Sequence, residues 1–310
     1  MILRPVDVLT LAYFGAGTVL VCVGHKHVSR WYEVPLSFGL ASLVIVVLAV
    51  VHGRRPGDSR IAFLRLTYPL LAMAYIYVLA GRSALAIHGR YLDTEVNSFE
   101  LSVFGDHPNL VLDRLATQPL TELMMAGYVL YYAFFLVPPL ILLAQRRRHE
   151  LERYVFTLTF VLYVCFVGFS LVPLVGPALS LSDSFETREL SGYLATGVQH
   201  FIASFGDPPG ACWPSAHVAG AWAALLSIRQ AFGTSALWAT LPVTVCITIA
   251  VVYCRYHYAS DALAGLVVTA ACYPVAVRLF FRIGPGAACT TWLGGTRTRV
   301  GRAPRRLSHL

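Results

Sequence analysis

Two histidines and one aspartate are the residues of this sequence best suited to acid–base and nucleophilic chemistry. His217 ends the stretch WPSAH at residues 213–217, and His257 and Asp261 lie in RYHYASD at residues 255–261. Both stretches border long apolar runs, where ionisable side chains are costly unless they face a polar cavity or one another. We therefore predict that the three side chains share one functional site.

The WPSAH stretch has the features of a phosphate-binding helix start. Pro214 suits the first turn of a helix, which would put Ser215 and His217 in the same turn. Free backbone N–H groups and the helix dipole attract phosphate at such an end. A histidine there can protonate an oxygen leaving phosphorus, or take a proton from an attacking hydroxyl.

The second stretch pairs an imidazole with a carboxylate. His257 and Asp261 are four residues apart, so they share a face if the helix extends back through them. Alternatively, Ser260 or Asp261 caps the helix and the carboxylate turns back to the ring. In both cases Asp261 orients His257 and leaves its other ring nitrogen as a nucleophile. Arg255 offers a forked donor, and we predict Arg255 and Ser215 as phosphate ligands.

Each residue also has a plain structural explanation. His217 can be a structural residue that forms a hydrogen bond within the fold. His257 and Asp261 can be an ordinary pair of side chains on a helix surface, and Arg255 can lie at the membrane interface as an anchor. The occurrence of both stretches, each at a predicted helix start, favours the functional interpretation.

The elements that position these residues are predicted to be membrane helices. With 57% hydrophobic and only 13% charged residues, the chain has the composition of an integral membrane protein. Lipid cannot form hydrogen bonds with backbone N–H and C=O groups, so a segment that spans the membrane must pair them internally as a helix. The predicted fold class is therefore an all-α polytopic membrane bundle of about eight transmembrane helices. The crossings are expected near residues 6–23, 34–51, 61–80, 120–144, 153–172, 213–229, 235–253 and 260–281.

The loops predict how the bundle is oriented. Basic residues gather at 53–60, at 145–153 and in the C-terminal tail, whereas residues 82–118 and 180–210 are acidic. The positive-inside rule then places both termini in the cytoplasm and the site on the extracytoplasmic side. Within the first acidic loop, Val96 to Leu115 is predicted to lie as a short amphipathic helix on the membrane surface.

We divide the chain into three parts on this basis. Residues 1–94 form N-terminal transmembrane helices, 95–282 a catalytic membrane domain, and 283–310 a basic cytoplasmic tail. The net charge of +8 fits the positive-inside bias and anionic headgroups, so we expect a membrane and no nucleic acid as partner. The oligomeric state is left open.

The cysteines give little support for a metal–thiolate centre. The seven cysteines form no CxxC pair, so we expect no bound metal and no cofactor. Cys212 and Cys254 each lie just before one of the two stretches, and a disulfide between them is kept as an alternative.

At these residues the sequence resembles the type 2 phosphatidic acid phosphatase superfamily. PSAH at 214–217 is similar to its second motif, and HYASD at 257–261 to its third. The sequence RYHY at 255–258 and the loop FGDHP at 104–108 resemble the aureobasidin-resistance branch, which contains the inositol phosphorylceramide synthases. The resemblance covers about residues 95–280 and implies a six-helix core.

The resemblance implies a metal-independent reaction on a lipid phosphoester. His257 would be phosphorylated, Asp261 would orient it, and His217 would act first as acid and then as base. The sequence departs from the phosphatase branch because its first motif, a lysine seven residues before Arg-Pro, is absent: Glu33 stands at that distance from Lys26. Val251 also stands where that branch has an arginine, six residues before His257. These departures favour the transferase branch.

Several functions fit this reading. The first is an integral-membrane lipid phosphotransferase of the bacterial plasma membrane, which passes a phospho-headgroup to an acceptor hydroxyl. The second is a lipid phosphate phosphatase, with water as acceptor. A third, of another class, is a lipid transporter or scramblase that uses the polar cavity without covalent chemistry. A fourth is a metal site, because two histidines and a carboxylate can bind iron or zinc.

Overall fold

Twelve α-helices and no strand occur in the described part of the chain. The computed structural model describes residues 3–283 except 56–57, 205 and 207, so the predicted basic tail at 283–310 lies outside the described residues except for Ile283, the last residue of the final helix. Eight helices are long: α1 (Pro5–Val23), α2 (Glu33–Arg54), α3 (Ser59–Arg82), α6 (Gln118–Ala144), α7 (Arg148–Leu171), α10 (Ala216–Phe232), α11 (Thr234–Tyr253) and α12 (Ala259–Ile283). Four are short: α4 (Asp93–Phe104), α5 (Pro108–Asp113), α8 (Pro177–Ser180) and α9 (Leu194–Ala203).

The long helices confirm the predicted all-α membrane bundle. Seven of them are, by length and composition, able to cross a membrane, and α10 is excluded from that set by its 17 residues. A crossing needs about 17 to 25 residues, so α10 is at the lower limit. Each of the eight predicted crossings overlaps one of these helices.

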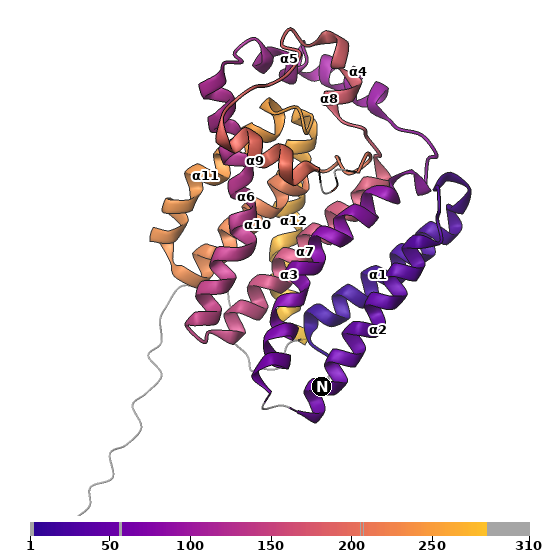
Figure 1. Ribbon diagram of the computed structural model, residues 1–310, viewed down its shortest axis with the longest axis vertical. Coiled ribbons are helices and arrows are strands. Elements are labelled where there is room, and N and C mark those ends of the chain that lie inside the picture. Colours follow the sequence, from indigo (N-terminus) through magenta and orange to yellow (C-terminus); the bar gives the residue numbers. More distant parts are fainter. Residues whose placement is uncertain (1–2, 56–57, 205, 207, 284–310) are drawn as a thin grey trace, which may run out of the picture.

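Helix α7 is the centre of the bundle. In its most apolar stretch 78% of the residues are buried, against 22% to 39% in the other six candidate spans. Helices α6, α10 and α12 pack on it directly, α11 packs against α6 and α10, and α3 and α1 approach from the N-terminal side. In Figure 1, α1 and α2 form one flank of the bundle and α11 the other. The helices that carry the two motifs, α10 and α12, therefore lie against the most buried element of the fold.

A buried polar cluster joins α1 to α3 at the end of the bundle where the chain begins. Arg65 forms an ion pair with Asp7, and the Tyr68 hydroxyl donates to the same carboxylate at 2.6 Å. Asp7 is fully buried and Arg65 is 3% exposed. This cluster stabilises the N-terminal helices and lies at the opposite end of the bundle from the cap described next (Figure 1).

Four short helices cap the other end of the bundle. Helices α4, α5 and α8 lie over it in Figure 1, and α9 packs beside α6. The prediction of one surface helix over 96–115 is wrong in its form, because Gly105 adopts φ 77° and ends α4 before α5 begins at Pro108. A left-handed residue is a common helix stop, and glycine adopts it without steric cost. The break lets α5 turn back over the bundle.

Candidate active site

His217 lies in the first turn of α10. The helix begins at Ala216, because the Ser215 hydroxyl accepts the Val218 N–H at 3.3 Å and caps the helix. The prediction that Pro214 occupies the first turn is therefore wrong by two residues, but His217 is still placed at the helix start. Its ring is half-buried between Tyr128 and Tyr131 of α6, with centroid distances of 4.5 Å to each.

His257 is held by the tight turn that joins α11 to α12. Its N–H donates to the Val251 carbonyl at 2.9 Å, and Arg255 in the same turn adopts φ 64°. Helix α12 begins at Ala259, so the alternative in which the helix extends back through His257 is wrong, and so is a helix cap at Ser260 or Asp261. Asp261, in the first turn, instead reaches back to accept the Tyr258 N–H at 3.0 Å. The same oxygen, Oδ2, lies 3.5 Å from His257 Nδ1.

Close packing of α10 against α12 brings the two stretches together. A Cβ on Gly265 would lie 2.7 Å from the Ser215 carbonyl oxygen, so only glycine allows this approach. The Ser215 N–H donates to the Asp261 carbonyl at 3.0 Å, which links the start of α10 to that of α12. As a result the His217 and His257 rings lie with centroids 5.7 Å apart in an edge-to-face arrangement.

The three predicted residues differ in their access to solvent. His257 is 3% exposed and Asp261 is fully buried, whereas His217 is half-buried. Because Nδ1 of His257 faces the carboxylate, Nε2 on the other side of the ring is the nitrogen left to act on a substrate. The arrangement can therefore present one oriented imidazole nitrogen and one proton donor to the same phosphorus atom.

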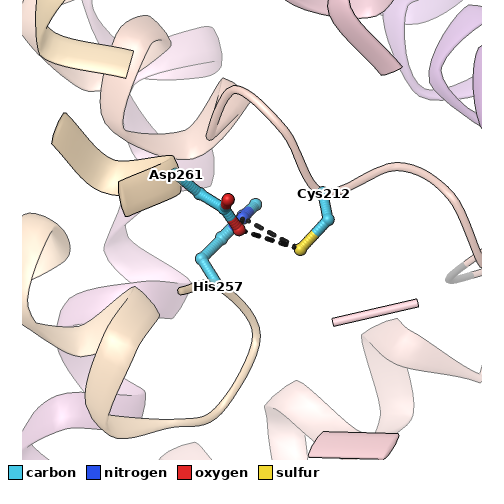
Figure 2. A group of neighbouring side chains, drawn as sticks. All are labelled: Cys212, His257 and Asp261. Carbon is cyan, nitrogen blue, oxygen red and sulfur yellow. Dashed lines mark hydrogen bonds and ion pairs between the residues drawn. The ribbon is translucent and has the colours of Figure 1, made fainter. Parts of the chain in front are cut away.

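Cys212 is a site residue that the sequence reasoning did not assign to the chemistry. Its Sγ lies 3.1 Å from Asp261 Oδ2, 3.5 Å from His257 Nδ1 and 3.2 Å from the Tyr256 carbonyl oxygen. Figure 2 shows the sulfur directed at the carboxylate and the imidazole. The alternative of a disulfide with Cys254 is wrong, because both side chains are thiols. Nothing in the local sequence distinguishes a thiol that forms a disulfide from one that faces an imidazole and a carboxylate.

Three ligand atoms of this group can hold a metal ion. Cys212 Sγ, His257 Nδ1 and Asp261 Oδ2 all lie within 4.8 Å of one another, and all three residues are buried. Sulfur, nitrogen and one carboxylate oxygen form a set that suits zinc rather than magnesium or calcium.

Polar side chains of the cap hold the turn that carries His257. Asn109 of α5 donates from Nδ2 to the carbonyls of Val252 and His257, at 2.8 and 3.0 Å. Glu100 of α4 accepts the Ser260 N–H at 2.8 Å. These contacts join residues more than 140 positions apart in the chain, so sequence patterns gave no signal for them.

Asp93 connects the same turn to the loop after α7. Its carboxylate accepts the N–H groups of Val175 and Gly176 at 2.9 and 3.0 Å, and the Tyr258 hydroxyl at 2.9 Å. Asp93 therefore fixes Tyr258, the residue that follows the proposed nucleophile.

Arg255 is bound within the protein. Its Nη2 donates to Asp113 Oδ1 at 2.5 Å and to the Thr187 carbonyl at 2.6 Å, and its guanidinium stacks 3.8 Å from the Phe185 ring centroid. The side chain is 9% exposed. A role as an open phosphate ligand does not agree with these contacts, which give Arg255 the task of fixing the turn and the cap. Only its Nε has no hydrogen-bond partner among the residues the structure describes.

Burial changes the protonation of the cap carboxyls. Loss of solvent raises the pKa of Glu100 above its ordinary value, and the hydrogen bonds from Ser260 oppose this shift. Burial also raises the pKa of Asp93, against the hydrogen bonds that it accepts. Both carboxyls are therefore more readily protonated in the folded protein than on an open surface.

Comparison with known proteins identifies the family of this chain. The profile of the PAP2 superfamily matches residues 94–275, more than half of the chain. No curated protein matches the sequence, and no solved structure matches the fold. The matched range contains His217, His257 and Asp261 and the helices that bring them together. The chain therefore belongs to the PAP2 superfamily, and this membership supports a lipid phosphatase or phosphotransferase type of activity.

Proposed function

We propose that the protein is an integral-membrane lipid phosphotransferase that works through a phosphohistidine at His257. The observation that carries the proposal is the meeting of two imidazoles from separate helices, 5.7 Å apart, with a buried carboxylate on Nδ1 of His257. A nucleophile, a group that orients it and a proton donor are the parts that covalent transfer needs.

In the first step His257 Nε2 attacks the phosphorus of the donor lipid. The N–P bond forms as the bond to the leaving oxygen breaks, and His217 gives that oxygen a proton. Asp261 holds Nδ1–H and stabilises the positive charge that develops on the ring. Its oxygen also accepts the Tyr258 N–H, which fixes the carboxylate while the reaction proceeds.

In the second step an acceptor hydroxyl takes the phosphoryl group. His217, now neutral, removes the hydroxyl proton, the new O–P bond forms, and the N–P bond to His257 breaks. The site is then restored with its original protons. The reaction needs no metal, and we expect activity in the presence of a chelator.

Phosphate oxygens are proposed to bind at the start of α10. The helix has 17 residues and its first N–H groups face the site, so it supplies the positive end of a helix dipole. Ser215 uses its oxygen to accept the Val218 N–H, and its hydroxyl proton remains available as a donor. Arg255 can contribute only if it exchanges one of its contacts with Asp113 and Thr187.

Transfer to a hydroxyl is favoured over hydrolysis by the cap. Asn109 and Glu100 hold α5 and α4 against the catalytic turn, and a closed cover that excludes water protects a reactive phosphoenzyme. The closed cap and the RYHY sequence at 255–258 together support a transferase similar to the inositol phosphorylceramide synthases. Hydrolysis by the same intermediate is the alternative, with water as acceptor.

The surface beside the site suits a lipid substrate. Helix α9 buries the polar Thr196 and Gln199 and exposes Leu194, Val198 and Phe201. Polar residues inside and apolar residues outside are the pattern of a helix that faces acyl chains. Glu122 of α6 holds this helix by accepting the N–H groups of Ala195 and Thr196 at 2.5 and 3.2 Å.

We propose the bacterial plasma membrane as the location, with both termini cytoplasmic and the cap outside. Basic residues at the turns 54–55 and 146–148 lie at the end opposite the cap, as the positive-inside rule requires. Cys22 is exposed near the cap end of α1 and gives a direct test. An impermeant maleimide should label intact cells, and Cys22→Ser should remove the label. Labelling that requires permeabilised cells would reverse the orientation.

The phosphoenzyme is the decisive test of the mechanism. Purified protein is incubated with a lipid whose phosphate is radiolabelled, quenched and digested, and the labelled peptide is sequenced. We expect label on His257 and none in His257→Ala. The control is His149→Ala, a histidine packed on Phe280 at the other end of the bundle, which should keep the label. Lipid movement without any covalent label would instead support a transporter or scramblase.

The acceptor is identified in the same preparation. Product is measured with and without added hydroxyl acceptors such as inositol or a diacylglycerol. A transferase gives product in proportion to the acceptor, whereas free phosphate formed at one rate with or without acceptor would establish a phosphatase.

A further inference from the structure

We propose that Cys212, His257 and Asp261 form an inhibitory binding site for zinc or a chemically similar divalent ion. This inference concerns regulation of the catalytic group and uses the thiol that the phosphotransfer reaction leaves without a role. Zinc binding itself does not depend on the proposed function, whereas its inhibitory effect rests on the phosphohistidine mechanism.

The spacing of the ligand atoms fits one face of a zinc tetrahedron. The edges are 3.5 Å from Sγ to Nδ1, 3.1 Å from Sγ to Oδ2, and 3.5 Å from Nδ1 to Oδ2. Zinc bonds of about 2.3 Å to sulfur and 2.0–2.2 Å to nitrogen and oxygen require tetrahedral edges of about 3.3 to 3.6 Å. The three side chains therefore need to move apart by only a few tenths of an ångström at the Sγ–Oδ2 edge.

The charge balance also favours a divalent cation. A metal-bound cysteine is a thiolate, so Cys212 and Asp261 together supply two negative charges and a Zn²⁺ ion neutralises both. Neutral sites are favoured in a buried environment such as this one, where Asp261 is fully buried and Cys212 is 5% exposed. Asp261 Oδ1 is buried and has no hydrogen-bond partner among the residues the structure describes, so the carboxylate retains capacity for a ligand.

Metal binding and phosphoryl transfer require opposite tautomers of His257. A neutral imidazole carries one proton. As a nucleophile, His257 keeps the proton on Nδ1 toward Asp261 and uses the Nε2 lone pair. As a zinc ligand it must use the Nδ1 lone pair, which moves the proton to Nε2 and blocks attack. The thiol proton of Cys212 is released to solvent on binding. Zinc therefore inhibits by removing the reactive tautomer and by occupying Asp261.

The donor atoms predict which ions inhibit. Thiolate and imidazole select zinc, cadmium and cobalt, whereas magnesium and calcium prefer sites made of oxygen atoms. We expect reversible inhibition by Zn²⁺ and Cd²⁺, recovery on addition of a chelator, and no inhibition by Mg²⁺ or Ca²⁺ at equal concentration.

Cobalt gives a measurement of binding that is independent of catalysis. The purified full chain in detergent is titrated with Co²⁺, and the thiolate charge-transfer band in the near ultraviolet is recorded. We expect saturation at one equivalent, and binding at least about 100-fold weaker without the band in Cys212→Ser, because a direct ligand is lost. Cys254→Ser and Cys22→Ser remove another buried thiol and an exposed one, and should keep the band. A band that persists in Cys212→Ser, or no saturable band, would overturn the proposal.

Zinc-loaded wild-type protein supplies a test that needs no variant. Its X-ray absorption spectrum should contain one sulfur at about 2.3 Å and nitrogen or oxygen ligands at about 2.0–2.2 Å. A shell without sulfur would refute the site even if Cys212→Ser failed to fold. Binding without inhibition of a working phosphotransferase would refute the tautomer argument alone. Binding in a protein that forms no phosphoenzyme would leave the site in place and refute the proposed function.

Discussion

Replacement of Asn109 by alanine tests whether the cap positions the nucleophile. The Asn109 amide donates to the carbonyls of Val252 and His257, and the residue is 1% exposed. The Val252 carbonyl has a second donor, the Arg255 N–H at 3.1 Å. The His257 carbonyl therefore depends more on Asn109, and removal of the Asn109 amide should free the backbone of His257, the proposed nucleophile.

The expected magnitudes follow from these two contacts. A net hydrogen bond contributes about 0.5 to 1.5 kcal/mol, so the free energy of unfolding should fall by about 1 to 3 kcal/mol in Asn109→Ala. The catalytic effect should be larger, because a displacement of about 1 Å at a reacting group can cost about 100-fold in rate. We expect kcat to fall by about that factor and KM to change little, since the Asn109 amide bonds to backbone carbonyls of the turn.

The assay is steady-state turnover of a lipid phosphate in detergent, together with thermal unfolding of the same samples. Tyr68→Phe is the matched control, because it removes one hydrogen bond to the buried Asp7 carboxylate at the other end of the bundle. A bond to a charged acceptor is worth about 1.5 to 3 kcal/mol, so the control should lose similar stability and keep kcat. Equal kcat losses in both variants, or an unchanged kcat in Asn109→Ala despite a lower Tm, would refute the positioning role.

Three further predictions concern the cap and the catalytic turn. Asp113→Ala should lower the free energy of unfolding by about 3 to 5 kcal/mol, because the buried Arg255 charge loses its ion-pair partner. The double variant with Arg255→Met should regain part of that free energy, measured by chemical denaturation. Burial raises the pKa of Glu100, so the folded protein binds this proton more tightly than the unfolded chain does. The contribution of Glu100 to stability therefore falls as the pH rises from the ordinary pKa of the group through its raised pKa. Glu100→Gln should therefore raise Tm at pH 7 and flatten the dependence of Tm on pH above the ordinary pKa of a glutamate, and a Tm difference that stays constant from acid to neutral pH would contradict this. Asp261→Asn should reduce phosphoenzyme formation by about 10⁴-fold through the wrong tautomer of His257, measured by rapid quench, and a normal rate would remove Asp261 from the mechanism.

The sequence predicted the bundle well because membrane crossing is a local property. A helix that spans lipid needs a continuous apolar run of fixed length, so composition along the chain locates each of the eight long helices. The same reasoning failed at 96–115, where amphipathic character suggested one helix. There the outcome depended on Gly105 and on what α5 meets when it turns back.

For the site, local spacing was enough to identify the residues but not their partners. His257 and Asp261 are four residues apart, so their proximity follows from the turn that joins them. The partner of Arg255 could not be predicted from local spacing, because Asp113 is 142 residues away in the chain. Its carboxylate binds the guanidinium that we had predicted as a phosphate ligand.

By itself, then, the sequence determined which segments cross the membrane and which three side chains are costly enough there to suggest chemistry. Only the tertiary structure decided that α10 and α12 meet at Gly265, that Asn109 holds the turn of His257, and that the Cys212 sulfur contacts the Asp261 carboxylate. The physical reason is that hydropathy and helix periodicity are summed over neighbours in the chain, whereas a buried side chain takes its partner from whichever distant helix packs against it.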